Sequence, residues 1–232
     1  AKNPRAYGQT ITVHAHGLER SLDKRKIVII GANVSGGLAA ATLAQDHPDC
    51  QVTLIHSPEA KRPLVGESLT EFSTQMLHRL GMSAYLEQDQ YHKYGLTFYF
   101  KESLENPSCR RYAVHEALSK PPLPSNQINR FTFDVALRKV GVEKGVHLIE
   151  GRATDAVINS QGRHQVTVKT ESGEQILEAD WLIDASGRNR FLARRLNLHQ
   201  DPPFQRSSFW FRLVDFDRSL LKNLVAIKPP QI

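Results

Sequence analysis

The sequence predicts an α/β fold with a parallel β-sheet and a three-stranded antiparallel β-meander. Residues 26–56 supply the first observation, because a β-branched run at 27–30 and an apolar run at 51–56 enclose good helix formers at 38–43. Strand, helix and strand in this order are typical of a right-handed parallel crossover. Residues 153–183 supply the second observation, since apolar and polar side chains alternate there with a period of two and turn residues interrupt the pattern.

A glycine-rich turn follows the first predicted strand. It has the sequence GANVSGG and contains Gly31, Asn33, Ser35 and Gly36. In the pattern G-x-G-x-x-G, the first glycine makes a tight turn, the second lets backbone approach a pyrophosphate, and the third lets the helix pack closely against the strand. Asn33 replaces the second glycine, and asparagine tolerates left-handed backbone better than other non-glycine residues. The turn predicts a Rossmann-like nucleotide site at the helix N-terminus, with an ordinary strand–helix turn as the alternative.

The end of the second predicted strand departs from the nucleotide-binding pattern. An acidic residue about 20 residues beyond the glycines normally holds a ribose hydroxyl. Here the strand ends in His56 and Ser57 instead. Either Glu59 reaches back to the ribose, or His56 and Ser57 contact it in another way.

A short polar segment precedes the next predicted helix. It runs from Arg62 through Gly66, Glu67 and Ser68 into a helical pattern at residues 70–80. Gly66 permits a tight strap of backbone, whereas Glu67 and Ser68 are also explained by capping of the helix that follows. The apolar side of this helix is expected to contain Phe72, Met76, Leu77 and Leu80.

The strand–helix alternation is interrupted and then resumes. Residues 89–126 contain a strand-like run at 96–100 between turn residues, and we interpret them as an excursion out of the nucleotide domain. A helix at residues 131–140 and a parallel-type strand at 146–150 follow. The core side of that helix is expected to contain Phe133, Ala136, Leu137 and Val140.

The last part of the chain returns to an apolar strand at residues 181–185, which runs into the sequence DASGR. A short basic helix is predicted at residues 190–196, and residues 206–216 are strand-like and aromatic. These last residues start a new element near the end of the chain.

Composition indicates an ordinary globular protein, with 23% charged and 40% apolar residues. The net charge of +6 suggests nucleic-acid binding, but residues 1–26 hold six lysines and arginines against two acidic residues and so carry most of it. We therefore expect a solvated basic tail and no nucleic-acid partner. The two cysteines lie outside any metal-ligand spacing and suggest a reducing, cytoplasmic location. No apolar run is long enough to predict a membrane span, and no metal site is expected.

Three motifs in fixed order carry a family resemblance. They are GANVSGG after the first strand, R-x-x-x-GES after the second, and DASGR after the meander. With these motifs the chain resembles the FAD-dependent monooxygenase superfamily, most closely its branch of flavin-dependent tryptophan halogenases, over residues 26–216. The resemblance implies a Rossmann-like FAD-binding fold with the start of a substrate-domain sheet.

The resemblance also implies roles for individual residues. Those at the FAD pyrophosphate would be Gly31, Asn33, Ser35 and Gly36, and those in a strap beside the isoalloxazine would be Gly66, Glu67 and Ser68. Arg62 would face the flavin nucleotide, Arg130 would contact the cofactor ahead of its helix, and Ala153 would border the adenine. Asp184 and Gly187 match a second glycine-acid motif that shapes the crevice, and a strand-end cap is the alternative role for Asp184.

The implied domain organisation places an extension at residues 1–25 and the FAD-binding domain at residues 26–88 and 127–205. Residues 89–126 would lead toward a substrate domain, and residues 206–232 would start that domain. The family's WxWxIP motif and its later Gly-Asp motif do not occur in the chain. The chain therefore resembles the N-terminal part of such an enzyme, and no catalytic residue is assigned.

The chemistry implied is oxidation of a small organic substrate through a flavin C4a-hydroperoxide, with a flavin reductase or NAD(P)H as reductant. Halogenases of this group carry a lysine in the helix after the strap, and no lysine lies between Arg62 and Lys93. A general monooxygenase or oxidoreductase is therefore favoured over a halogenase. The alternative is a non-catalytic or incomplete nucleotide-binding module. An NAD(P) site is disfavoured because the meander and the DASG strand follow the FAD pattern.

Overall fold

The structure is a computed structural model, and it describes residues 24–58, 65–93, 97–102, 105–106, 112–116, 123, 125–200, 211 and 214–217. The expected extension at residues 1–25 lies almost entirely outside the described residues, and Glu59 and Arg62 lie outside them too. The strand-like run at residues 206–216 is likewise outside them, apart from residues 211 and 214–216.

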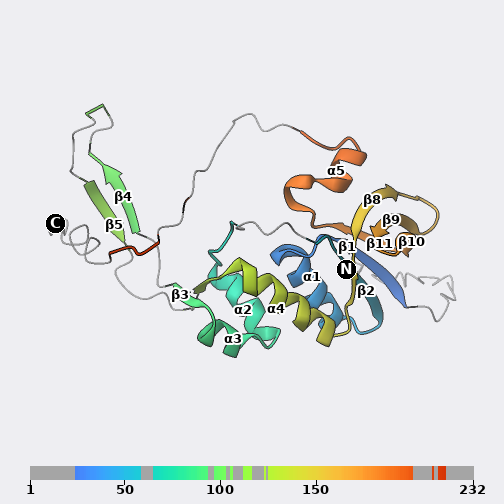
Figure 1. Ribbon diagram of the computed structural model, residues 1–232, viewed down its shortest axis with the longest axis horizontal. Helices are drawn as coiled ribbons and strands as arrows, with labels where there is room; N and C mark the ends of the chain where they lie inside the picture. The colour runs from blue at the N-terminus through green and yellow to red at the C-terminus, as the bar shows by residue number, and fades with distance from the viewer. Residues whose placement is uncertain are drawn as a thin grey trace, which may run out of the picture.

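A parallel four-stranded sheet forms the centre of the fold (Figure 1). Its strands are β1 (Arg25–Ile30), β2 (Cys50–His56), β7 (His147–Glu150) and β11 (Trp181–Asp184), in the spatial order β11-β1-β2-β7. Each neighbouring pair is parallel. The predicted α/β fold with a parallel sheet is confirmed.

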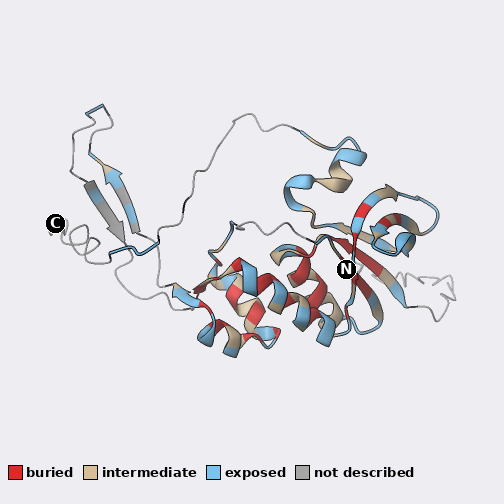
Figure 2. Ribbon diagram, in the orientation of Figure 1, coloured by how far each residue is buried: buried red, intermediate tan, exposed pale blue. Residues whose placement is uncertain are grey.

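The run at residues 27–30 is apolar throughout because β1 is buried on both faces. Ile27 and Ile29 pack in a cluster with α1, whereas Val28 and Ile30 pack with residues of the meander on the opposite face. Alternate residues of a strand point to opposite faces, so a four-residue apolar run serves two cores at once. Figure 2 shows this burial along the sheet.

Helices cover one face of the sheet (Figure 1). They are α1 (Val34–Asp46) and α4 (Arg130–Glu143), while α2 (Glu71–Arg79) and α3 (Ser83–Gln88) pack in a core cluster with α4 and with Ala41 of α1. In α4, Phe133 and Leu137 are fully buried while Ala136 and Val140 pack at the edge of the same cluster, which confirms the predicted core stripe.

The predicted apolar side of α2 is partly wrong. Leu77 and Leu80 are buried, but Phe72 is 74% exposed. The buried face of α2 includes Thr74, and Phe72 lies two residues, or about 200° of helix rotation, away from it. Phe72 therefore points to the opposite side of the helix.

The other face of the sheet is covered by the predicted antiparallel meander. Its strands are β8 (Arg152–Val157), β9 (His164–Thr170) and β10 (Gly173–Ala179), in the order β10-β9-β8. Val166 and Val168 alternate with exposed or half-buried neighbours and are completely buried against Val28 and Ile30. After β11 the chain forms a single 3₁₀ turn, η1 (Gly187–Asn189), and a short basic helix, α5 (Phe191–Arg195).

The predicted excursion contains two small antiparallel sheets. One pairs β3 (Tyr91–Lys93) with β6 (Ser125–Gln127), and the other pairs β4 (Thr97–Lys101) with β5 (Tyr112–Glu116). The β4–β5 pair lies apart from the central sheet and its helices (Figure 1). Among the described residues, no helix is long and apolar enough to cross a membrane.

Candidate functional site

A cleft of about 360 Å³ opens at the carboxyl ends of the parallel strands. Its lining comes from the end of β1 and the turn after it, the end of β2 with the two residues that follow, Gly151 with the start of β8, the turn after β11, and the first residue of α5. Ligands of open α/β folds bind at this edge of the sheet. The lining residues are Ile30, Gly31, Ala32, Asn33, Ile55, His56, Ser57, Pro58, Gly151, Arg152, Ala153, Ser186, Asn189 and Phe191.

Backbone hydrogen bonds join these strand ends. The Gly31 N–H donates to the Ile55 carbonyl at 3.0 Å, and the Ala185 N–H donates to the Ile30 carbonyl at 2.9 Å. Gly31 has φ +104°, and a Cβ there would lie 2.5 Å from the Ala185 carbonyl oxygen. Glycine is required at this position because the backbone is left-handed and because the DASG turn packs directly against it.

The N-terminus of α1 has no side-chain cap. Asn33 is the N-cap residue, with extended backbone at φ −73° and ψ −176°, and its side chain makes no capping hydrogen bond. The turn therefore does not use the left-handed conformation that asparagine tolerates, and an extended N-cap is normal backbone for asparagine. The first N–H groups of a helix have no partner within it and form, with the helix dipole, a site for an anion. Ser35 and Gly36 lie in this turn.

The ribose end of the predicted site contains His56 and Ser57, which both line the cleft. Glu59 lies outside the described residues. Sequence reasoning missed Arg152 and Asn189, which line the same cleft. The signal for Arg152 was available, because it follows β7 and the carboxyl ends of parallel strands meet at one edge. Asn189 arrives from the 3₁₀ turn, whose path the sequence pattern did not indicate.

The turn after β11 is organised by Asp184. Its Oδ1 accepts a hydrogen bond from the Ser186 N–H at 2.9 Å, and its Oδ2 accepts one from the Leu192 N–H at 2.8 Å. The carboxylate thus caps both the turn and the start of α5, as in the alternative role stated above. Gly187 begins η1 with φ +61°. The turn holds Ser186 and Asn189 at the cleft.

The GES segment is a strap attached to β6. Ser68 forms an isolated antiparallel bridge with Gln127, the Ile128 N–H donates to the Glu67 carbonyl at 2.7 Å, and the Leu69 N–H donates to the Asn126 carbonyl at 2.9 Å. The N-cap of α2 is Thr70, whose side chain accepts from the Ser73 N–H. Neither Glu67 nor Ser68 is therefore the N-cap of α2, and that alternative is wrong.

Arg130 is the first residue of α4 and is 8% exposed. Its guanidinium binds the Asp134 carboxylate through Nε and Nη2, both at 2.7 Å, and donates from Nη1 to the Val65 carbonyl at 2.8 Å. The structure therefore brings Arg130 to the strap. A contact between Arg130 and the cofactor stays a prediction.

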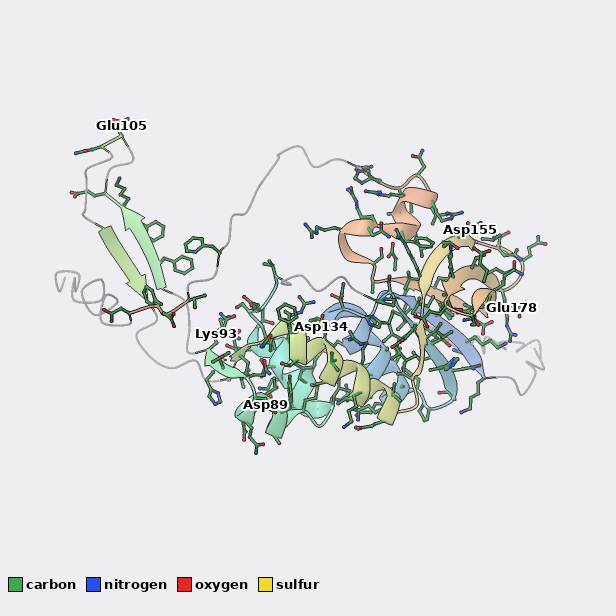
Figure 3. All side chains as sticks on the ribbon, viewed as in Figure 1. Asp89, Lys93, Glu105, Asp134, Asp155 and Glu178 are labelled. Carbon is green, nitrogen blue, oxygen red and sulfur yellow. The ribbon has the colours of Figure 1, made fainter. Side chains whose placement is uncertain are left out.

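A lysine also lies beside the strap, although none occurs in α2. Lys93 comes from β3, and its Nζ donates a hydrogen bond to the Leu69 carbonyl at 3.0 Å. Figure 3 shows Lys93 on β3 and Asp134 on α4 in the same part of the molecule. The sequence pattern of the helix does not indicate this lysine, because residue 93 returns to residue 69 through the pairing of β3 with β6.

The sequence profile of the tryptophan halogenase family matches residues 26–115 and 111–205. The chain therefore belongs to this family, which confirms the resemblance inferred from the three motifs.

Individual relatives agree with this assignment. The chain is 26% identical over 208 residues to a 1H-pyrrole-2-carbonyl-[peptidyl-carrier protein] chlorinase of Pseudomonas fluorescens, covering 83% of this chain and 46% of that protein. It is 27% identical over 174 residues to LodB of Marinomonas mediterranea, named as an FAD-dependent oxidoreductase, covering 74% of this chain and 45% of that protein. The solved structure of the flavin-dependent halogenase CmlS superposes with a TM-score of 0.64 at 25% identity, covering 75% of this chain and 31% of that one.

The chain thus spans less than half the length of these relatives. The matches confirm the Rossmann-like flavin-protein fold and the similarity to the N-terminal portion of such proteins.

Proposed function

We propose that this chain is the FAD-binding portion of a flavin-dependent oxidoreductase of the halogenase type. The observation that carries the proposal is the cleft at the carboxyl ends of β1, β2 and β11. The glycine turn lines this cleft, and α1 begins at its edge without a side-chain cap. The domain assignment, with residues 26–88 and 127–205 as the FAD-binding part, belongs to the same proposal.

The residues present fit the adenine, ribose and pyrophosphate of FAD. The backbone at Gly31 and Asn33 and the first N–H groups of α1 would hold the pyrophosphate, since a helix N-terminus favours an anion. His56, Ser57 and Arg152 offer side chains to the ribose without a carboxylate. Ala153 is 9% exposed and supplies a flat, apolar border for the adenine.

The strap supplies the second half of the proposed site. Gly66 has φ +102°, so its backbone turns tightly without a Cβ in the way. Gly66, Glu67 and Ser68 would lie beside the isoalloxazine, and Arg62 would face the flavin nucleotide. When bound, reduced flavin activates dioxygen for oxidation of an organic substrate or a halide. This chain would hold and orient the cofactor, with its reducing equivalents supplied by a flavin reductase or NAD(P)H.

Equilibrium titration of the purified chain tests the proposal. Flavin fluorescence with added FAD should report saturable binding, ADP should compete because it fills the same cleft, and NAD⁺, which carries the same ADP moiety, should compete no better than ADP. Ser57→Trp fills the mouth of the cleft from an exposed position, so the affinity for FAD and for ADP should both fall about tenfold or more, which corresponds to about 1.4 kcal/mol.

Ser160→Trp is the matched control, because Ser160 is exposed in a turn that does not line the cleft. A chain that is folded by circular dichroism and binds no FAD would overturn the proposal and favour the non-catalytic module. Preferential binding of NAD⁺ would favour a nicotinamide site.

A second candidate function is halide oxidation, and Lys93 favours it. The family resemblance predicts an ammonium group near the strap to capture or position hypohalous acid. Lys93 supplies one beside Leu69, which follows the strap directly. This weakens the sequence-based preference for a general monooxygenase, which depended on the missing lysine.

Product analysis separates the two reactions. The protein is supplied with FAD, a flavin reductase, bromide or chloride, and phloroglucinol as an electron-rich aromatic probe, and the products are identified by mass spectrometry. Lys93→Met should abolish halogenated product while FAD affinity is unchanged, and Lys139→Met, on the exposed side of α4, should retain it. A hydroxylated product that does not depend on halide would favour the monooxygenase.

A further inference from the structure

An ion pair at the start of α4 is almost completely buried. The side chains of Arg130 and Asp134 are 10% and 5% exposed, and two hydrogen bonds of 2.7 Å join them in a bidentate pair one helical turn apart. A buried ion pair is weak evidence of stabilisation because the desolvation of both charges opposes their attraction. Stability alone therefore does not explain why this pair is buried at the start of α4.

The guanidinium uses its other edge on the strap. Nη1 lies 2.8 Å from the Val65 carbonyl oxygen and 3.5 Å from the Gly66 carbonyl oxygen. Val65 is 53% exposed, so this stretch of backbone is open on one side and held by Arg130 on the other. A Cβ on Gly66 would stand 3.1 Å from the same nitrogen, so a side chain there would crowd the guanidinium in addition to straining the left-handed backbone.

The strap has a second attachment next to the first. Its backbone hydrogen bonds reach Asn126 and Ile128, in the segment that leads directly into α4. Backbone pairing fixes Glu67 and Leu69, and the arginine fixes Val65 and Gly66. Without Arg130, Val65 and Gly66 would lose the hydrogen bonds that hold their carbonyls, and the left-handed backbone of Gly66 would be left to set the direction of the strap.

We propose that Arg130 is a positioning residue for the GES strap. Asp134 orients the guanidinium, and the guanidinium holds the Val65 and Gly66 carbonyls, so that the affinity for the flavin ring depends on the pair through the strap. The inference rests on the proposed FAD site. In it, Arg130 acts on the cofactor through the backbone of the strap and does not contact the cofactor directly. A direct contact would compete with the Asp134 and strap bonds that Arg130 already makes.

The double variant Arg130→Met/Asp134→Leu tests the proposal. It removes both charges together, so no unpaired charge is left buried, and both new residues favour a helix. The control is Lys139→Gln/Glu143→Gln, an exposed pair with the same spacing in the same helix. Amide hydrogen exchange is measured in the chain without ligand, and the affinities for FAD and for ADP are measured by titration.

We expect the Leu69 and Ile128 amides to exchange about tenfold faster in the double variant, while amides in the middle of α4 keep their protection. FAD affinity should fall about tenfold, equivalent to about 1.4 kcal/mol, and ADP affinity should change less than about twofold. Arg130→Lys keeps a positive charge but lacks the planar fork, so it should restore FAD affinity only in part.

The outcomes separate this inference from the proposed function. If the natural chain binds no FAD, the proposed function fails, and hydrogen exchange alone still decides whether Arg130 holds the strap. Unchanged exchange at Leu69 and Ile128 overturns the positioning role. Loss of FAD affinity with unchanged exchange would assign Arg130 to direct contact, and an equal loss of ADP affinity would indicate damage to the cleft.

Discussion

The cleft and the strap are positioned by different means. In the cleft, backbone does the positioning, because parallel strands end at one edge and Gly31 allows the DASG turn to pack against the glycine turn. In the strap, the same task falls to a buried side-chain pair and a short β-bridge between segments about 60 residues apart in the chain. The glycine turn and the GES strap are both readable as sequence motifs, whereas the Arg130–Asp134 pair that holds the strap is not.

The largest effect is expected from breaking the ion pair on one side only. Arg130→Met leaves the Asp134 carboxylate buried and unpaired, so the free energy of unfolding should fall by about 3–5 kcal/mol. Urea denaturation measures it. The Arg130→Met/Asp134→Leu variant should recover most of the loss, and a single variant as stable as the natural chain would show that the pair is not buried in solution.

The next largest effect concerns the backbone of the cleft. Gly31→Ala forces a Cβ toward the Ala185 carbonyl at a left-handed position and should reduce the free energy of unfolding by about 3 kcal/mol. Gly81→Ala is the matched control, with φ +88° and nothing among the described residues within 4 Å of the added Cβ. It should cost only about 1 kcal/mol by thermal or urea unfolding. Equal losses would mean that the close approach of the two turns is unimportant.

A smaller effect separates the helix cap from the strap. Thr70→Ala removes the side chain that caps α2 and should lower stability by about 1 kcal/mol. Ser68→Ala, at an exposed strap residue, should change it by less than about 0.5 kcal/mol. Both values come from urea denaturation of otherwise identical chains. A larger loss of stability in Ser68→Ala would show that the GES serine has a structural role.

The smallest effect depends on pH and tests the far end of the sheet. The Lys26 N–H donates to Asp180 Oδ2 at 2.7 Å, and this bond, with help from Arg163 and against partial burial, lowers the pKa of Asp180 from 3.8. A carboxyl with a lowered folded-state pKa stabilises the fold above its unfolded pKa and loses that contribution as the pH falls through the folded value. Asp180→Asn should therefore cost up to about 1 kcal/mol at pH 7 and progressively less below about pH 4.

The unfolding free energy at several pH values measures this difference. Asp49→Asn, at an exposed turn position, serves as the control and should show no comparable trend. A pH-independent loss in Asp180→Asn would assign the effect to packing and not to the charge.

Particular residues show how much could be predicted. The parallel sheet and the meander were predictable from the apolar patterns at residues 27–30 and 166–168. A strand buried on both faces is apolar at every position, whereas a strand buried on one face is apolar at alternate positions. Gly31 was predictable as a turn glycine, although its close neighbour Ala185 was not. Phe72 was predicted to be buried and is exposed, because the apolar pattern of a helix does not show which part of its surface packs against the rest of the protein.

The sequence by itself determined the α/β order of elements, the family and the glycine turn, since each of these depends on local pattern and backbone preference. Only the tertiary structure decided that Asp184 caps its own turn, that Thr70 rather than Ser68 caps α2, and that Arg130 and Lys93 reach the strap. These contacts join residues through sheet pairing and helix packing, and such pairings are set by which surfaces meet when the whole chain folds.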